Sequence, residues 1–440
     1  MTTQFRLMNE RRFLPFFVTQ FLGAFNDNVY KNALVVLITF EAARYTTVSP
    51  GVLVNLAAGL FILPFFLFSA TSGQLADKYE KSRLIRLTKL FEIAVMGLAV
   101  VAFAIDSLAL MLATLFLMGA QSSIFGPVKY ALLPVHLKED ELVGGNALVG
   151  SGTFVAILLG TIGGGVLIAL PDGARWVSAA VVAIAVLGYL ASRGIPHAQA
   201  ADPQLAINWN PLTETVRNLR FVRENRDVFV GVLGISWFWF YGALFLAQFP
   251  GYAKDVLGGD EHAVTLLLAV FSVGIGVGSL ACERLSGKHL EVGLVPFGSI
   301  GLTLFALDLW WASPVPAASG VPLELGALLA VAGTWRVLFD LLMIGAFGGF
   351  FIVPLYTLVQ SRSEPGHRSR VIAGNNILNA LFMVVAAGMG AALLAAGLTV
   401  AELLMVGALL NAGVAVALCA AMPEFARRFR AWLRPSLRPR

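Results

Sequence analysis

Long apolar runs recur along the whole chain, separated by short polar segments that carry most of the charge. A helix needs about 20 apolar residues to cross the hydrocarbon core of a bilayer. Twelve runs approach or exceed that length, and each predicts one membrane-spanning helix: 13–40, 50–72, 84–104, 107–128, 145–170, 176–194, 228–250, 263–282, 292–312, 336–360, 371–396 and 401–422. The pattern therefore predicts an all-α integral membrane protein with about twelve transmembrane helices and no large soluble domain.

The polar segments orient these helices. With the N-terminus in the cytoplasm, the predicted inner segments and the span ends next to them hold 25 of the 31 Lys and Arg residues. Cytoplasmic loops of membrane proteins carry such an excess. We therefore expect both termini in the cytoplasm, and we attribute the basic balance to topology and anionic membrane lipids instead of nucleic acid.

Composition excludes several classes of protein. The chain is 58% hydrophobic and only 13% charged, whereas a soluble domain is about 25% charged. Cys282 and Cys419 lie on separate predicted helices, so they indicate neither a disulfide framework nor a metal site. No phosphate-binding loop is present, and His136 and Asp140 are one residue too close for the His-x4-Asp pair of an acyltransferase. We expect no enzyme activity, no metal and no cofactor.

The chain also repeats itself at an offset of a little over two hundred residues. "GQLADKYEKSR" (73–83) is echoed by "GSLACERLSGK" (278–288), and "GGNALVG" (144–150) by "AGNNILN" (373–379). We therefore expect two six-helix pseudo-repeat halves. The predicted parts are an N-terminal bundle (1–194), a cytoplasmic linker with an amphipathic helix (195–227), a C-terminal bundle (228–422) and a basic cytoplasmic tail (423–440).

Two resemblances follow from these motifs. The duplicated halves and "GQLADKYEKSR" resemble the major facilitator superfamily, whose loop signature runs G-x-L-a-D-r-x-G-r-k, although Glu80 stands here where the signature has its second glycine. "QFLGAFNDN", "FGPVKYALLP", "GGNALVGSGT" and "GGFFIVPLYTLVQ" are similar to the bacterial lysophospholipid transporter family.

The resemblance implies a flippase-like secondary transporter with the major facilitator fold, working by alternating access around a site between the halves. It also implies lysophospholipid, mainly lysophosphatidylethanolamine, as the substrate, moved across the bacterial inner membrane for reacylation. Membrane lipids and a cytoplasmic acyltransferase are the expected partners of a monomer. The alternative is a proton-coupled exporter of small amphipathic compounds with Asp27 as the proton carrier.

A polar cluster interrupts the first span. At 100° per residue, Gln20, Asp27 and Lys31 share one face, with Asn28 and Asn32 on its flank. A charge at the centre of the bilayer costs about 2.5–3.5 kcal/mol, so such residues face a cavity or a partner. We interpret all five as substrate-binding. The alternative is a structural ion pair between Asp27 and Lys31, four residues apart with the acid first, which would keep Asp27 ionised and disfavour it as a proton carrier.

Other polar residues carry two interpretations each. Lys129 follows Pro127, which we expect to break the fourth helix, so Lys129 is either substrate-binding or a plain loop lysine. Lys89 and Glu92 open the third span, where Lys89 either faces a cavity or extends its ammonium to the cytoplasmic surface.

Four more residues are candidates for the substrate site. Asn375 and Asn379 share a face of the eleventh span and bind either substrate or a neighbouring helix. Trp237 and Tyr241 lie near mid-membrane in the seventh span, where they form either an apolar wall for an acyl chain or part of the packed core.

Two pairs are predicted to gate the transporter. The resemblance implies that Asp77 and Arg83 hold the inner helix ends together. Arg336 and Asp340, four residues apart, are expected to form the outer counterpart or a plain surface ion pair.

Overall fold

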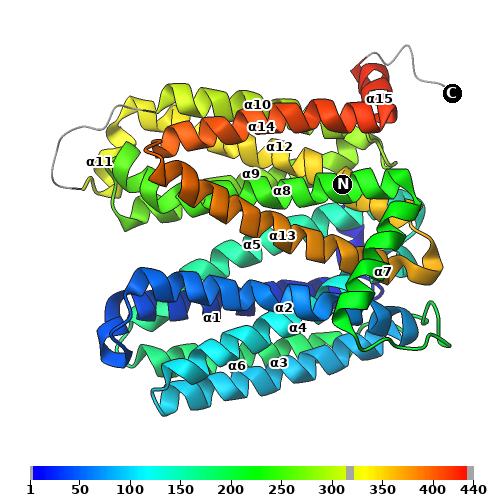
Figure 1. Cartoon of the computed structure of the whole chain (residues 1–440), viewed down its shortest axis with the longest axis horizontal. Coiled ribbons are helices and arrows are strands. Elements are labelled where there is room, and N and C mark those ends of the chain that lie inside the picture. The colour runs from blue at the N-terminus through cyan, green and yellow to red at the C-terminus, as the bar shows by residue number, and fades with distance from the viewer. Residues whose placement is uncertain (1–2, 314–321, 434–440) are drawn as a thin grey trace. The chain divides into compact units, whose positions relative to one another are not determined.

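The computed structural model describes residues 3–313 and 322–433, and its long elements are helices (Figure 1). Each predicted span coincides with one helix: α1 (Leu14–Tyr45), α2 (Pro50–Lys78), α3 (Lys81–Ala104), α4 (Leu108–His136), α5 (Leu142–Ala169), α6 (Gly173–Ser192), α8 (Arg226–Gly251), α9 (Glu261–Ser286), α10 (Leu294–Ala312), α12 (Ala332–Arg362), α13 (Arg368–Ala395) and α14 (Val400–Ala421). Within the described ranges, eleven of these are long and apolar enough to cross a membrane, and α1, with its polar centre, is not among them. The prediction of an all-α protein with about twelve spans is confirmed.

Shorter helices lie between and after the spans. They are η1 (Thr3–Asn9), η2 (Glu139–Glu141), α7 (Pro211–Glu224), the π-helical turn η3 (Tyr252–Val256), α11 (Leu325–Ala330), η4 (Pro365–His367) and α15 (Pro423–Leu433). α7 occupies the predicted amphipathic part of the linker. α15 begins the predicted basic tail, whose last residues, 434–440, lie outside the described residues.

The chain packs as two compact units. Unit 1 comprises Met1–Glu139, Val155–Asn225 and Gln360–Ala380, and unit 2 comprises Asp140–Phe154, Arg226–Val359 and Leu381–Arg440. The start of α5 thus packs with unit 2, and the start of α13 packs with unit 1. The boundaries of the two sequence halves stay a prediction.

In unit 1, α1, α2, α3, α4 and α6 run side by side (Figure 1). One face of α1, formed by Val29, Tyr30, Ala33 and Leu34, is buried in the apolar core that these helices share. The Tyr30 hydroxyl donates to the carbonyl of Met111 in α4 at 2.8 Å. This packing sets the rotation of α1 and therefore the direction in which its polar residues point.

Glycines allow two pairs of helices to approach closely. A Cβ atom on Gly164 of α5 would lie 2.3 Å from the carbonyl oxygen of Val29 in unit 1. A Cβ atom on Gly278 of α9 would lie 1.9 Å from the carbonyl oxygen of Ala346 in unit 2. Small residues at such crossings are the usual means of close packing between helices in a membrane.

The fourth span departs from its prediction. α4 continues through both Pro127 and Pro134 to His136, so the expected break at Pro127 is wrong. Membrane helices tolerate proline because neighbouring groups and local adjustments satisfy the freed backbone. Lys129 consequently lies inside a helix with an exposed fraction of only 9%, and the loop-lysine interpretation is wrong as well.

Glu80, which stands where the loop signature has its second glycine, has a structural role as a helix cap. Its carboxylate caps α3 by accepting hydrogen bonds from the backbone N–H groups of Ser82 at 3.0 Å and Arg83 at 2.7 Å. It also accepts from the N–H of Ala198 at 2.7 Å. Partial burial raises the pKa of Glu80, but these hydrogen bonds outweigh it and hold the pKa below its ordinary value.

Candidate functional site: a charged cluster inside unit 1

Asp27 and Lys31 are held by different neighbours. Asp27 Oδ2 accepts a hydrogen bond from the hydroxyl of Ser122 in α4 at 2.5 Å. Asp27 Oδ1 is buried and has no hydrogen-bond partner among the described residues. The ammonium of Lys31 lies 5.6 Å from the centre of the Phe61 ring in α2, and within the described part of the chain Lys31 forms no ion pair. The structural ion pair between Asp27 and Lys31 is therefore wrong.

A true ion pair lies beside them. Lys89 Nζ is 2.6 Å from Glu92 Oε2, and their side chains are 0% and 1% exposed. Glu92 also accepts from the amide of Asn26 in α1 at 2.9 Å and from that of Gln121 in α4 at 3.1 Å. A lysine that reached the membrane surface would be exposed, so that interpretation of Lys89 is wrong. The pair joins α1, α3 and α4.

The side-chain amides of Asn28 and Asn32 in α1 form hydrogen bonds within unit 1. Asn28 donates to the carbonyl of Ala24 at 2.8 Å. Asn32 donates to the carbonyl of Asn28 at 2.9 Å and to the hydroxyl of Thr161 in α5 at 3.1 Å. Gln20 is buried on the same helix, one turn before Ala24. These contacts hold the flank of the predicted face in place.

The cluster has an excess of positive charge. Asp27 and Glu92 supply two carboxylates, whereas Lys31, Lys89 and Lys129 supply three ammonium groups, and electrostatic interactions connect Asp27 to all four of the other residues. Few protein groups in a membrane helix are charged unless they serve a substrate or ion pathway. The arrangement suits a ligand that brings a negative charge.

Asparagines of α13 lie in the same unit. Asn375 is 1% exposed and its Oδ1 has no hydrogen-bond partner among the described residues, while Asn379 is also buried. Asn376 was not predicted. A Cβ atom on Gly126 of α4 would lie 2.5 Å from its Nδ2, so α13 approaches α4 one turn from Lys129.

The aromatic residues of α8 lie in the core of unit 2. Trp237 donates through Nε1 to Asn411 of α14 at 2.8 Å, and Tyr241 donates to the carbonyl of Leu302 in α10 at 3.2 Å. Both side chains are buried. The packed-core interpretation accounts for these contacts, which leave neither ring as a free wall. Trp239, which was not predicted, is partly exposed and donates to the hydroxyl of Tyr356 at 3.2 Å.

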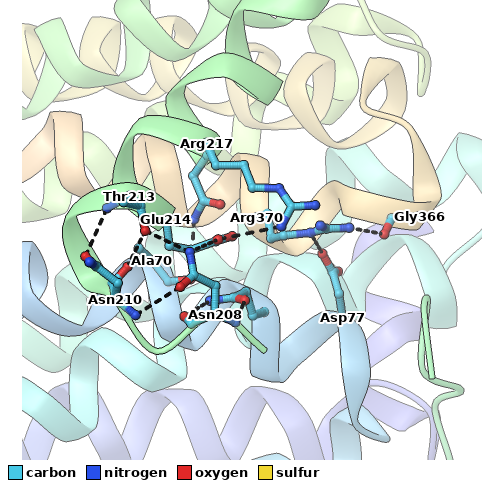
Figure 2. A network of polar contacts seen from close by, with 11 residues as sticks. Ala70, Asp77, Asn208, Asn210, Thr213, Glu214, Arg217, Gly366 and Arg370 are labelled. Carbon is cyan, nitrogen blue, oxygen red and sulfur yellow. Dashed lines mark hydrogen bonds and ion pairs between the residues drawn. The ribbon is translucent and has the colours of Figure 1, made fainter. Parts of the chain in front are cut away.

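Asp77 pairs with an arginine that the sequence analysis did not single out. Asp77 is fully buried at the end of α2, and its Oδ2 lies 3.0 Å from Arg370 Nε of α13. Its Oδ1 accepts from the N–H of Ser369 at 3.1 Å. Arg370 also donates to the carbonyl of Gly366 at 3.0 Å, as Figure 2 shows, and its guanidinium lies 4.8 Å from the centre of the Phe221 ring of α7. Arg370 thus joins α2, α7 and α13.

The linker helix supports this junction. Asn210 caps α7 by accepting from the N–H of Thr213 at 3.2 Å (Figure 2). Asn218 donates to the carbonyl of Ala70 in α2 at 3.4 Å. Arg83, which was expected to gate together with Asp77, has an exposed side chain.

The second predicted gating pair does not form. Arg336 pairs with Asp308 of α10, through Nε at 3.1 Å and through a second nitrogen at 2.5 Å. Asp340 is 0% exposed, and neither of its carboxyl oxygens has a hydrogen-bond partner among the described residues. The Arg336–Asp340 ion pair is therefore wrong, because an acid on another helix takes the arginine.

For some of the site residues that the sequence analysis did not single out, the sequence does contain a signal. Gln121 and Ser122 interrupt the apolar fourth span, as Asn26 interrupts the first, and polar residues inside a span are candidates in general. Arg370 and Asp308 have no such signal, because each lies near a helix end where charges are ordinary. Only the tertiary contacts distinguish them.

Comparison with known proteins agrees with the motifs. A family model described as Major Facilitator Superfamily matches residues 16–323. The lysophospholipid transporter LplT of Enterobacter sp. (strain 638) is 29% identical over 367 residues, 81% of each chain. That of Cronobacter sakazakii (strain ATCC BAA-894) is 29% identical over 374 residues, 83% of each chain. Both resemblances predicted from the motifs are confirmed.

Solved structures share the fold. The transporter FucP in the outward conformation is similar with a TM-score of 0.70 and 13% identity, covering 94% of this chain and 99% of that chain. The human organic anion transporter MFSD10 is similar with a TM-score of 0.69 and 14% identity, covering 96% of this chain and 99% of that chain.

Proposed function

Because the chain belongs to the Major Facilitator Superfamily, we propose that it is a secondary transporter that moves lysophospholipids across a bacterial inner membrane. The relatives in Enterobacter and Cronobacter bear the name of lysophospholipid transporters, which supports this substrate class. We take lysophosphatidylethanolamine as the main substrate, reacylated on the cytoplasmic side. A cytoplasmic acyltransferase is then the natural partner.

One observation carries the proposal. Within one turn of α1, the structure places a buried carboxylate oxygen without a donor, Asp27 Oδ1, and an ammonium group without an ion-pair partner among the described residues, that of Lys31. The head group of lysophosphatidylethanolamine carries an ammonium and a phosphate. A carboxylate suits the first and a lysine suits the second, through charge-assisted hydrogen bonds. Substrate binding therefore satisfies both residues at once.

The remaining charges favour the phosphate. Lys89 is neutralised by Glu92 at 2.6 Å, so Lys31, which forms no ion pair among the described residues, is the cation of α1 placed to meet a phosphate. Asn28 and Asn32 add neutral hydrogen-bonding groups on the same helix.

The acyl chain takes a different route from the head group. Moving one CH₂ group from apolar surroundings into water costs about 0.8 kcal/mol, so a long chain exposed to water costs on the order of 10 kcal/mol. We infer that the tail stays among apolar side chains or lipid while only the head group passes the charged cluster.

The junction at Arg370 acts as the inner gate in this proposal. Asp77 and Arg370 hold the end of α2 to the start of α13, with Phe221 of α7 against the guanidinium. Release of substrate to the predicted cytoplasmic side requires this buried pair to separate.

Transport in proteoliposomes tests the head-group proposal. Asp27→Asn removes the charge that meets the ammonium, and a hydrogen bond to a charged group contributes about 1.5–3 kcal/mol. We expect uptake of labelled lysophosphatidylethanolamine to fall about tenfold or more, with a smaller loss for lysophosphatidylglycerol, which lacks the ammonium. Lys31→Ala and Lys129→Ala should reduce uptake of both substrates alike.

A matched carboxylate provides the control. Asp106 lies outside the cluster with a partly exposed side chain paired with Arg44, so Asp106→Asn should leave the ratio of the two substrates unchanged. Each variant is first checked for wild-type thermal stability in detergent. A stable Asp27→Asn protein that transports both lysolipids at wild-type rates would contradict the proposal.

A further inference from the structure

A cavity lies at one end of unit 1, on the predicted outer side of the membrane. Its volume is about 1000 Å³, and α1, α3, α6 and the end of α5 contribute to its wall. Sites for small ligands and cofactors reach this size. Leu37, the lining residue of α1 that is nearest in sequence to Asp27, lies ten residues after it, about 15 Å along the helix. The cavity is therefore separate from the charged cluster.

One end of the cavity is charged and the other is apolar. The charged lining residues lie at the helix ends that face the predicted outer solution: Glu41, Arg44, Asp106, Asp172 and Arg175. Apolar side chains line the part nearer to the centre of the bilayer, among them those of Leu37, Val100 and Val182. A ligand that fits this cavity has a charged head and an apolar tail.

One face of α6 carries these groups in order. Asp172 precedes the helix, and Arg175, Ser178 and Val182 follow at intervals of three, three and four residues, so they lie on one face. From Asp172 to Val182 this face extends about 15 Å. Along it an acid, a base, a hydroxyl group and an apolar side chain succeed one another. A glycerophospholipid with an ethanolamine head group carries an ammonium, a phosphate, an ester and an acyl chain in the same order.

The polar groups of this face are available to a ligand. The nearest side-chain atoms of Asp172 and Arg175 are 3.7 Å apart, too far for a hydrogen bond, and both side chains are exposed. Ser178 is only 8% exposed, and its hydroxyl forms no hydrogen bond with any described residue. A buried hydroxyl without a partner costs free energy, so an acceptor supplied by a ligand stabilises it.

The charged residues of the opposite wall already have partners. Arg44 forms ion pairs with Glu41 and Asp106. The Tyr45 hydroxyl donates to Asp106 at 2.7 Å. These contacts close the rim on the side of α1 and leave α6 as the wall that can bind a head group.

The surface around the cavity is suited to contact with lipid. Val101 of α3 and Trp176 and Leu187 of α6 are close in sequence to lining residues, and they are exposed although they are large and apolar. Tryptophan is enriched where hydrocarbon meets the head groups of a bilayer. The bilayer itself can therefore supply the occupant of the cavity.

We propose that this cavity binds a glycerophospholipid of the predicted outer leaflet whose head group carries an ammonium group. Asp172 binds the ammonium and Arg175 binds the phosphate, through charge-assisted hydrogen bonds. Ser178 donates to an ester oxygen, and an acyl chain lies along Val182 and Ala183. The site does not rest on the proposed function. Phospholipids with two chains and lysophospholipids share this chemistry, and the test separates them.

Native mass spectrometry of the full chain in detergent tests the head-group contacts. Diacyl phosphatidylethanolamine should bind more tightly than phosphatidylglycerol, which lacks the ammonium. Arg175→Ala should weaken binding of both about threefold, a loss typical of exposed charges. Asp172→Asn should remove the preference for phosphatidylethanolamine. The controls Lys254→Ala and Asp255→Asn change exposed charges outside the cavity and should bind both lipids as the wild type does.

Two further variants test the interior of the cavity. Ala183→Phe adds a ring at an exposed position of the apolar end and should weaken lipid binding about tenfold, because the acyl chain loses buried contacts. Ala391→Phe, at an exposed position outside the cavity, is its control and should not weaken binding. Ser178→Ala removes the hydrogen bond to the ester and should weaken binding about fivefold.

Comparison with lysophosphatidylethanolamine identifies the source of the ligand. Tighter binding of the diacyl lipid assigns a membrane phospholipid to the cavity, and tighter binding of the single-chain lipid assigns a lysophospholipid. The site is overturned if Arg175→Ala, Ser178→Ala and Ala183→Phe bind lipids as the wild type does, or if the controls lose binding to the same degree. None of these measurements needs transport, so a failure of the proposed function would leave the result intact.

Discussion

α1 and α8 begin the two predicted sequence halves, and both bury polar side chains, yet the two helices use these side chains differently. In α1 the polar groups are charged or amide side chains whose partners lie on α3, α4 and α5, and Asp27 Oδ1 remains without a donor. In α8 the polar groups are the tips of aromatic rings. Trp237 and Tyr241 each donate one hydrogen bond, to α14 and α10.

The difference separates packing from binding. A buried polar group that has found its partner specifies how helices pack, and it offers nothing to a ligand. A buried charge that has not found one costs free energy until a ligand arrives. Trp237 and Tyr241 are of the first kind, whereas Asp27 Oδ1, which has no hydrogen-bond partner among the described residues, and Lys31, which forms no ion pair there, are the candidates for the second.

Among the substitutions that test this comparison of α1 with α8, we expect the largest effect at Glu92. Glu92→Gln leaves the ammonium of Lys89 buried without its counter-ion, which costs about 3–5 kcal/mol of the free energy of unfolding. Thermal unfolding in detergent should therefore shift strongly to lower temperature. Glu41→Gln, in an exposed pair with Arg44 at 3.2 Å, is the control and should cost below about 1 kcal/mol. Unfolding of Glu92→Gln at the wild-type temperature would show that α1 packs without the ion pair.

A middle-sized effect is expected at Trp237. Trp237→Phe keeps a ring beside Phe240 but leaves Asn411 Oδ1 without its donor at 2.8 Å. An unsatisfied buried acceptor costs about 1–3 kcal/mol, measured as lower thermal stability. Trp311→Phe, at a ring that is 75% exposed, should change stability little.

Trp237→Phe also distinguishes the two interpretations of Trp237, as a wall for the acyl chain or as a residue of the packed core. If Trp237 is a packing residue, transport of long-chain and short-chain lysolipids should fall together. A selective loss of long-chain transport would restore the acyl-wall role predicted from the sequence and weaken the contrast with α1.

The smallest effect on stability is expected at Glu80, whose carboxylate accepts hydrogen bonds but lies at the surface. The pKa of Glu80 lies below its ordinary value, so its contribution to stability is present above the unfolded pKa of about 4.3 and is lost as pH falls through the folded pKa. Glu80→Gln removes the charge on a helix cap, and cap losses cost on the order of 1 kcal/mol. The difference in melting temperature from the wild type should shrink between neutral and acidic pH. A difference that does not change with pH would mean that the charge of Glu80 contributes nothing to the cap.

The candidate site was only partly predictable. The amides and charges of α1 are visible in the sequence because hydrocarbon disfavours them wherever they occur in a span. Their pairing was not, because the spacing of Asp27 and Lys31 allows an ion pair that the packing of α1 against α4 does not form. Arg336 likewise has two acids within reach, and the sequence shows only the one on its own helix.

The sequence by itself determined that this protein is a helical membrane protein with about twelve spans, because the length and apolarity of each run are local properties. Its motifs also determined the superfamily. Tertiary structure alone decided which charges are neutralised, since Glu92 meets Asn26 and Gln121, and Asp77 meets Arg370, only through contacts between distant segments. The physical reason is that a buried charge is stabilised or left open by atoms within a few ångströms, and the chain brings those atoms from helices far apart in sequence.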